Sequence, residues 1–212
     1  MKIYDLTRTV YTDMPVYDTD PLVKIKSVMT VQKDGYKLSD LKFGSHTGTH
    51  CDAFSHFIAD GENIDQMDLQ HFFGKALVIS VPCENGIIDC GKISDSLEKI
   101  RNEKILLIKT GWDKRNFDKR FFENFPCFCE PMGEILQNAG VITLGIDTPS
   151  VEISGEKSAE KAHIDLLGRK IAIIENLMLS EIPDGTYLFS ALPLKIKDCD
   201  GSPCRAVCVQ TD

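Results

Sequence analysis

Three of the five histidines in this 212-residue chain fall within eleven residues, with an aspartate among them. The segment HTGTHCDAFSHF carries His46, His50, Asp52 and His56. Imidazole nitrogens and a carboxylate oxygen are ligands of Zn²⁺, Mn²⁺ and Fe²⁺, and a set without thiolate leaves the metal more Lewis-acidic. Turn-capping or polar-core roles would explain a lone histidine, but four such residues so close together favour a metal site.

The spacing of these residues predicts a strand that follows a bend. On a strand, His50 and Asp52 project from the same face about 6.6 Å apart, within reach of one cation. His46 would lie about 13 Å from His50 in an extended chain, so the chain must turn between them. Gly48 permits that turn, and it also makes a helical turn there unfavourable. Cys51 has the opposite parity and should point away from the site.

The remaining histidines differ in their surroundings. His71 has no acidic or histidine neighbour at ligand spacing, and we expect a structural role for it. His163 shares a helix face with apolar residues and on that basis resembles a core histidine, but the next predicted strand ends in Glu175. Functional sites in α/β sheets gather at the carboxyl ends of strands. Asp113 and Asp147 also follow strands, and we expect turn or capping roles for both.

Helical and extended segments alternate from residue 64 onward, which predicts an α/β domain with substantial parallel pairing. The first ~60 residues lack long helical periodicity and indicate a mixed or antiparallel portion. No linker or repeat divides the chain, so we expect one domain over residues 1–212. The expected helices are 68–73, 95–101, 131–139 and 157–167, and the expected strands are 23–30, 76–81, 104–110, 141–146, 171–174, 186–192 and 204–210.

The composition excludes several classes of function. Apolar residues make up 42% and charged residues 26%, as in folded proteins. The net charge of −8 repels phosphate backbones, so we expect no nucleic-acid partner. No apolar run approaches the ~18 residues that span a bilayer, and the first residues do not resemble an export signal. We therefore expect a cytoplasmic protein with no membrane partner, whose eight cysteines stay reduced.

The string H-x-G-T-H-x-D-x-x-x-H-F at residues 46–57 resembles the signature of cyclase-like metal-dependent hydrolases, a family that includes bacterial kynurenine formamidase and isatin hydrolase. Further landmarks of that family follow in the same order along nearly the whole chain. They are YDLT at 4–7, TGW at 110–112, GIDTPSV at 145–151, ENL at 175–177, ALPLKI at 191–196 and GSPCRA at 201–206.

The resemblance implies a single α/β domain of the mixed-sheet, swivelling β/β/α type. It also implies one or two divalent metal ions per chain, Zn²⁺ in the first place and Mn²⁺ as the alternative. The first ion is then held by residues that match the family's ligands, namely His46, His50 and Asp52. A second ion shares Asp52 and is held by His163 and Glu175. His56 resembles the catalytic acid/base.

The function that follows is hydrolysis of a small amide, an arylformamide such as N-formylkynurenine, with His56 moving protons to and from metal-activated water. Phe54, Phe57 and Trp112 are candidates for an apolar wall against an aromatic substrate, and ordinary core roles explain each of them equally well. The family usually has proline where this chain has Phe54. The resemblance also implies a homodimer or homotetramer.

Three alternatives remain open. The same site could hydrolyse a cyclic amide of the isatin type, or a lactone. The site could hold a metal and a small carboxylate ligand without turnover, as a binding protein does. The cysteines could give the chain a redox or thiol-regulated role. Turnover of an amide by metal-loaded protein, loss of metal on replacing Asp52, and the reactivity of the thiols separate these hypotheses.

Overall fold

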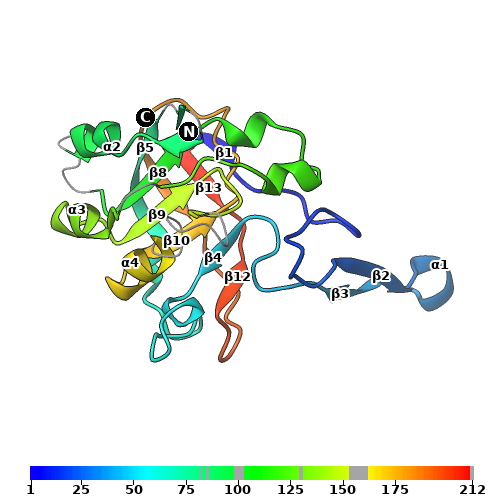
Figure 1. Cartoon of the computed structure of the whole chain (residues 1–212). Coiled ribbons are helices and arrows are strands. Elements are labelled where there is room, and N and C mark those ends of the chain that lie inside the picture. The colour runs from blue at the N-terminus through cyan, green and yellow to red at the C-terminus, as the bar shows by residue number, and fades with distance from the viewer. Residues whose placement is uncertain (82, 85, 98–102, 129–130, 153–161, 211–212) are drawn as a thin grey trace.

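The computed structural model describes residues 1–212 except 82, 85, 98–102, 129–130, 153–161 and 211–212. The described part is built around a nine-stranded mixed sheet (Figure 1). From one edge to the other, its strands are β1 (Lys2–Asp5), β13 (Val207–Gln210), β11 (Gly185–Ser190), β5 (Phe73–Ser80), β8 (Ile105–Lys109), β9 (Thr143–Ile146), β10 (Ala172–Glu175), β4 (His50–Asp52) and β12 (Gly201–Pro203). The expected α/β fold with a mixed sheet is confirmed.

The centre of the sheet is parallel and its edges are antiparallel. Strands β5, β8, β9 and β10 pair in parallel, whereas β4 and β12 on one side and β11, β13 and β1 on the other pair antiparallel. Strands β8, β9 and β10 are rich in apolar residues, as in ILLIK of β8, and nearly all of their residues are buried. Such runs are typical of parallel strands covered on both faces.

Helices cover part of this sheet. They are α2 (Cys90–Leu97), α3 (Gly133–Asn138) and α4 (Ala162–Gly168), which lie along one side in Figure 1. Among the residues that the structure describes, four short 3₁₀ helices occur in the connections: η1 (Phe54–His56), η2 (Leu69–His71), η3 (Trp112–Lys114) and η4 (Lys119–Phe122). Every helix in the described residues is too short or too polar to cross a membrane.

Most expected elements are present, with shifted ends. The strands expected at 76–81, 104–110, 141–146 and 171–174 correspond to β5, β8, β9 and β10. The helix expected to begin at Asp95 begins at Cys90 instead, because the Asp89 carboxylate accepts the Lys92 N–H and caps it there. The helix expected over 68–73 is only the single turn η2. Residues 98–101 and 157–161 of two expected helices lie outside the described residues.

A hairpin arm extends from the body of the molecule (Figure 1). It consists of β2 (Lys24–Met29), the single-turn helix α1 (Val31–Asp34) and β3 (Leu38–Lys42). A smaller hairpin joins β6 (Cys83–Glu84) to β7 (Ile87–Ile88). Several apolar side chains of the arm are exposed, namely Ile25, Val28, Val31, Tyr36, Leu38 and Leu41. A two-stranded hairpin buries little apolar surface by itself, so the arm offers this surface for contact.

Candidate metal and active site

Two adjacent strands carry the centre of the site. His50 and Asp52 lie on β4 with their side chains on one face, as the alternation of a strand requires. Cys51 points to the other face, where its thiol donates to the Ala191 carbonyl inside the core. Glu175 ends β10 directly opposite His50 in the antiparallel register, so its carboxylate reaches the same face. All three polar side chains are buried.

The chain turns back at Gly48 and brings His46 into this cluster. Gly48 has a φ of 65°, a left-handed conformation that glycine adopts without strain. After the turn, the His46 ring lies 5.0 Å from the His50 ring, and His46 Nδ1 is 2.8 Å from Asp52 Oδ1. The bend that the sequence requires between these histidines is therefore present.

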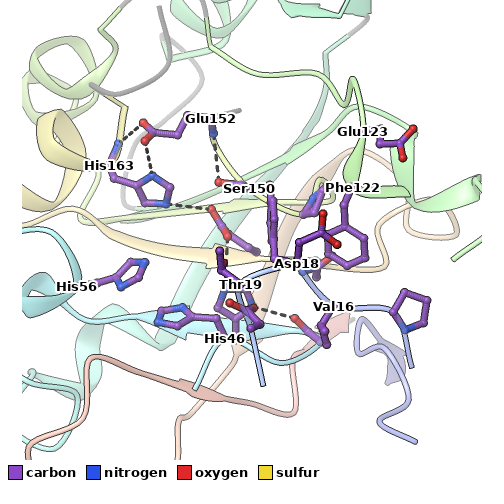
Figure 2. Close-up of a pocket in the computed structure, with 18 of the residues that line it drawn as sticks. Val16, Asp18, Thr19, His46, His56, Phe122, Glu123, Ser150, Glu152 and His163 are labelled. Atoms are coloured by element: carbon purple, nitrogen blue, oxygen red, sulfur yellow. Dashed lines mark hydrogen bonds and ion pairs between the residues drawn. The ribbon is translucent and has the colours of Figure 1, made fainter. Parts of the chain in front are cut away.

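His163 projects from α4 into the cluster (Figure 2). Its Nε2 lies 3.7 Å from Asp52 Oδ2 and 3.4 Å from Glu175 Oε1. His50 Nε2 lies 3.4 Å from both Asp52 Oδ1 and Glu175 Oε2. Asp52 Oδ1 thus faces His46 and His50, whereas Asp52 Oδ2 faces His163. The Asp52 carboxylate therefore lies between these imidazoles.

A carbonyl behind His50 and a carboxylate behind His163 lie next to the outer ring nitrogens of these residues. His50 Nδ1 lies 2.8 Å from the Gly48 carbonyl, so Nδ1 carries a hydrogen and Nε2 faces the carboxylates of Asp52 and Glu175, which against the effect of burial raise the pKa of His50. A metal bound between these groups would take the lone pair of Nε2. His163 Nδ1 lies 3.2 Å from Glu152 Oε1, and the His163 backbone N–H donates to the other oxygen of Glu152. Carboxylate or carbonyl acceptors behind a histidine are the usual support of a metal ligand.

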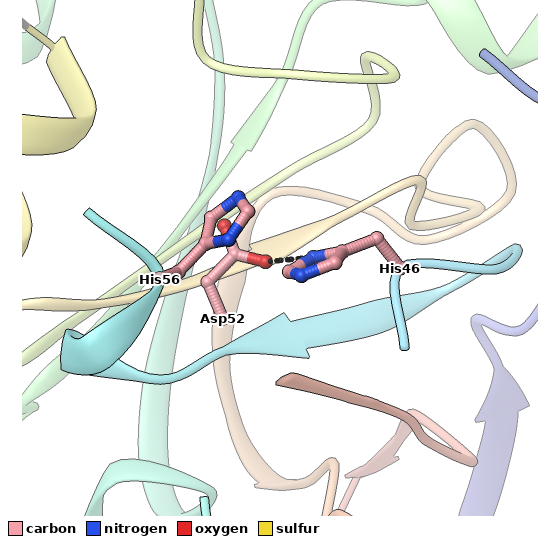
Figure 3. Close-up of side chains that lie close together, drawn as sticks. All are labelled: His46, Asp52 and His56. Carbon is pink, nitrogen blue, oxygen red and sulfur yellow. Dashed lines mark hydrogen bonds and ion pairs between the residues drawn. The ribbon is translucent and has the colours of Figure 1, made fainter. Parts of the chain in front are cut away.

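The remaining two rings share one acceptor. His46 Nε2 and His56 Nδ1 both contact Asp200 Oδ2, at 2.8 and 3.1 Å. The His46 and His56 rings are stacked, with centroids 4.0 Å apart. Figure 3 shows His56 beside Asp52 and His46, with the hydrogen bond between the latter two. In the described parts of the chain, two sets of side chains have ligand atoms within 4.8 Å of one another: His46, Asp52 and His56, and His50, Asp52 and Glu175.

The electrostatics of the cluster favour a cation. Burial alone would lower the pKa of His46, but its hydrogen bonds to Asp200 and Asp52 raise it to about 9. Burial likewise opposes the charge on His163, while Glu152 and Glu175 raise its pKa to about 10. The carboxylates of Asp52, Asp200, Glu152 and Glu175 therefore favour positive charge in the site.

A divalent metal ion fits the residues that surround Asp52. Within the described part of the chain, no donor hydrogen-bonds to the buried Asp52 Oδ2, although a buried acceptor without a partner is costly. Imidazole and carboxylate ligands of this kind suit Zn²⁺ and Mn²⁺. The unpartnered oxygen and the ligand chemistry both support a metal at this point.

A cavity of about 880 Å³ opens over the cluster. His56 lies on one side of it, and Val16, Asp18 and Thr19 of the loop at residues 15–20 lie on another (Figure 2). Phe57 also lines the cavity. The Phe57 ring lies parallel to the His163 ring with centroids 4.3 Å apart, and 41% of Phe57 is exposed. Tyr17 and Phe122, with ring centroids 5.1 Å apart, also line the cavity.

Phe54 and Trp112 do not line this cavity. Successive residues of a 3₁₀ helix are rotated by about 120°, so Phe54 and His56 in η1 leave the turn in different directions. Phe54 is buried in the core, with its ring edge against His71. Trp112 packs against Phe121 and donates its indole N–H to the Phe121 carbonyl. Both therefore have core positions.

The other polar residues that follow strands have structural contacts. Asp147 accepts hydrogen bonds from the backbone of Thr110 and Gly111 and fixes the turn after β8. Asp113 accepts the backbone N–H of Ser180. His71 Nδ1 lies 2.9 Å from the Ile142 carbonyl, away from the cluster.

Sequence reasoning missed Glu152, Asp200, Tyr17 and Phe122. Glu152 directly follows the GIDTPSV landmark, and Asp200 directly precedes GSPCRA. An acidic residue that flanks such a landmark is the signal that could have indicated the first two. Nothing in the sequence around the two aromatic residues distinguishes them from the other aromatic residues in the chain.

Comparison with known proteins gives matches over most of the chain. A sequence profile of the Cyclase family, described as "Putative cyclase", matches residues 4–153. Kynurenine formamidase of Bacillus anthracis is 31% identical over 210 residues, which cover 97% of this chain and 96% of that protein. Kynurenine formamidase of Delftia acidovorans is 28% identical over 207 residues, which cover 97% and 96%.

Solved structures share the fold over almost the entire chain. A predicted metal-dependent hydrolase from Bacillus stearothermophilus matches with a TM-score of 0.80 and 26% identity, over 98% of this chain and 97% of that one. Isatin hydrolase A from Labrenzia aggregata matches with a TM-score of 0.84 and 23% identity, over 100% and 94%. The second likeness concerns the fold alone.

Proposed function

The chain belongs to the cyclase family of metal-dependent hydrolases, and from this premise we propose that it hydrolyses the C–N bond of a small arylformamide such as N-formylkynurenine. The arrangement around Asp52 carries the proposal: three imidazoles and two buried carboxylates converge at the base of one cavity. Kynurenine formamidases that match nearly the full length of the chain support the choice of substrate.

A divalent metal is the cofactor of this reaction. We propose that His46, His50 and Asp52 hold one ion. His163 and Glu175, on the other side of the shared Asp52, hold a second ion or support the first. We propose Zn²⁺ as the physiological metal and Mn²⁺ as the alternative, because both accept mixed imidazole and carboxylate ligands.

His56 is the proton carrier of the proposed reaction. When bound, the metal supplies Lewis acidity that makes water acidic near neutral pH and polarises a carbonyl. His56 lines the cavity beside the proposed ligand His46, and burial lowers its pKa below the usual 6.5, so its ring is neutral near pH 7 and can accept a proton. It takes the proton of the attacking water and delivers it to the departing nitrogen. The same residue thus acts as base and then as acid.

Aromatic side chains of the cavity suit an aryl substrate. Phe57 presents the side of the cavity next to His163, and Tyr17 and Phe122 present another. Apolar walls with a few convergent polar groups are the usual composition of a small-molecule site. An aromatic ring held by these walls would direct its formamide group toward the cluster around Asp52.

Hydrolysis of N-formylkynurenine by the purified chain, loaded in turn with Zn²⁺ and Mn²⁺, tests the proposal. We expect release of kynurenine that disappears when a chelator removes the metal and returns when the metal is restored. Metal-loaded protein that releases no kynurenine would overturn the arylformamide substrate. Turnover of isatin in the same assay would then assign a cyclic amide, and tight ligand binding without turnover would assign a binding protein.

We further propose that two copies of the chain associate through the hairpin arm of β2 and β3, as a homodimer or as the unit of a homotetramer. Exposed Ile25 and Leu41 lie opposite each other on one face of the arm, where a second copy can cover them. Leu41→Glu should shift the molar mass measured by light scattering to that of a smaller assembly. Lys26→Glu on the opposite face is the control, and an unchanged mass in Leu41→Glu would contradict this assignment of the interface.

A further inference from the structure

Asp200 is fixed in the loop that enters β12. Its backbone carbonyl accepts the Ala53 N–H at 2.9 Å, and its Oδ1 accepts the Ser45 hydroxyl at 2.9 Å. The next residue, Gly201, pairs with Asp52 across the sheet. The backbone of Asp200 is therefore fixed beside Asp52, and Ser45 holds one oxygen of its carboxylate.

The second oxygen of the Asp200 carboxylate contacts two histidines, His46 and His56. Oδ2 lies 2.8 Å from His46 Nε2 and 3.1 Å from His56 Nδ1. An ionised carboxylate only accepts hydrogen bonds, so each of these nitrogens carries the hydrogen. By the same rule His46 Nδ1, 2.8 Å from Asp52 Oδ1, also carries a hydrogen in the metal-free chain. If a metal displaced that hydrogen, Nδ1 would offer its lone pair to the metal, and the neutral His56 ring has its lone pair on Nε2.

We propose that Asp200 is a positioning residue that sets the tautomers and ring orientations of His46 and His56 together. This inference rests on the proposed function, in which His46 is a metal ligand and His56 the proton carrier. Through His46, Asp200 presents Nδ1 to the metal; through His56, it leaves Nε2 as the nitrogen that accepts the proton. One carboxylate thereby couples the geometry of the metal ligand to that of the acid/base.

Replacement of Asp200 should affect metal binding and turnover together. Asp200→Ala removes both hydrogen bonds, and we expect Zn²⁺ affinity, measured by competition with a chromophoric chelator, to fall by about 10- to 100-fold. At saturating Zn²⁺ we expect kcat for N-formylkynurenine to fall by a similar factor with little change in KM. Asp200→Asn keeps one acceptor oxygen and should give an intermediate loss.

Matched variants separate positioning from a general effect on the loop. Asp198→Asn makes the same change of charge two residues away, at a side chain that is 67% exposed, and should leave both measurements within about twofold of wild type. Ser45→Ala removes only the bond to Oδ1 and should cost less than Asp200→Ala. Equal losses of Zn²⁺ affinity and kcat in Ser45→Ala and Asp200→Ala would show that the position of the loop, and not the hydrogen bonds to the histidines, causes the effect.

Histidine ¹⁵N NMR of the full chain gives a readout independent of activity. We expect neutral His56 to carry its hydrogen on Nδ1 in wild type and to lose this preference in Asp200→Ala. An unchanged His56 tautomer, with Zn²⁺ affinity and kcat within twofold of wild type, would overturn the inference. A wild-type chain that does not release kynurenine would refute the proposed substrate alone, because tautomer and Zn²⁺ affinity still decide the role of Asp200. If Asp200→Ala does not fold, the near-isosteric Asp200→Asn serves for both measurements.

Discussion

His50 and Glu175 lie directly opposite each other on β4 and β10, with His50 Nε2 3.4 Å from Glu175 Oε2. This one pairing joins the histidine-rich segment to the strand that ends the central parallel part of the sheet. A register slip of one residue would turn Glu175 to the other face. The geometry of the cluster therefore depends on the pairing of two strands that are far apart in the sequence.

Asp52→Ala should remove metal and activity together. The two oxygens of Asp52 face different histidines, and Asp52 belongs to both sets of close ligand atoms, so we expect Zn²⁺ affinity to fall by more than about 100-fold, with loss of turnover. Metal content by atomic emission and the kynurenine assay measure the two effects. Asp60→Ala, at an exposed position, is the control. Full activity in Asp52→Ala would refute the site.

His56→Ala should separate turnover from metal binding. The proposal gives His56 a proton-transfer role, and loss of a general acid/base costs about 10²- to 10⁴-fold in rate. We expect kcat to fall by that factor while the metal content stays near that of wild type. His56 also belongs to one of the two sets with ligand atoms in close proximity. Loss of metal from this variant would identify His56 as a ligand instead.

Gly201→Ala should disturb the site through the backbone. A Cβ at this position would lie 2.8 Å from both the Cys51 carbonyl and His46 Cε1, and the carbonyl belongs to a buried strand. We expect a loss of about 1–3 kcal/mol in the free energy of unfolding, with weaker Zn²⁺ binding as His46 is displaced. Gly74→Ala, whose Cβ would meet only Ile105 at 3.8 Å, is the matched control. Urea denaturation of both variants measures the difference, and equal losses would contradict the steric argument.

Local patterns in the sequence predicted the part of the site that one segment builds. The alternation of His50 and Asp52, and the glycine between them and His46, required a strand and a bend, and both are present. The sequence also predicted that Glu175 lies at the end of a strand, as it does in β10. What the sequence did not show is which strands become neighbours, because that depends on the packing of the whole chain.

The same physical reason explains why other features of the site could not be predicted from the sequence. Asp200 reaches the histidines only because β12 pairs with β4. β12 is a three-residue strand without the apolar alternation that would predict a strand from the sequence. Phe54 was a candidate for the substrate wall by its distance from His56 along the chain. The 3₁₀ turn that separates their directions was not evident from the residue types.

Protonation of the half-buried His71 should lower the free energy of unfolding of the protein in mild acid. Burial lowers its pKa below the usual 6.5, although the bond to the Ile142 carbonyl opposes this shift. The unfolded chain therefore binds a proton more readily than the folded chain as the pH falls through 6.5, and the folded state loses stability over that interval. His71→Asn keeps an N–H donor for the carbonyl but cannot titrate. Urea unfolding at pH 7.5 and 5.5 should show a smaller loss of stability in this variant than in wild type, and equal losses would show that His71 does not contribute.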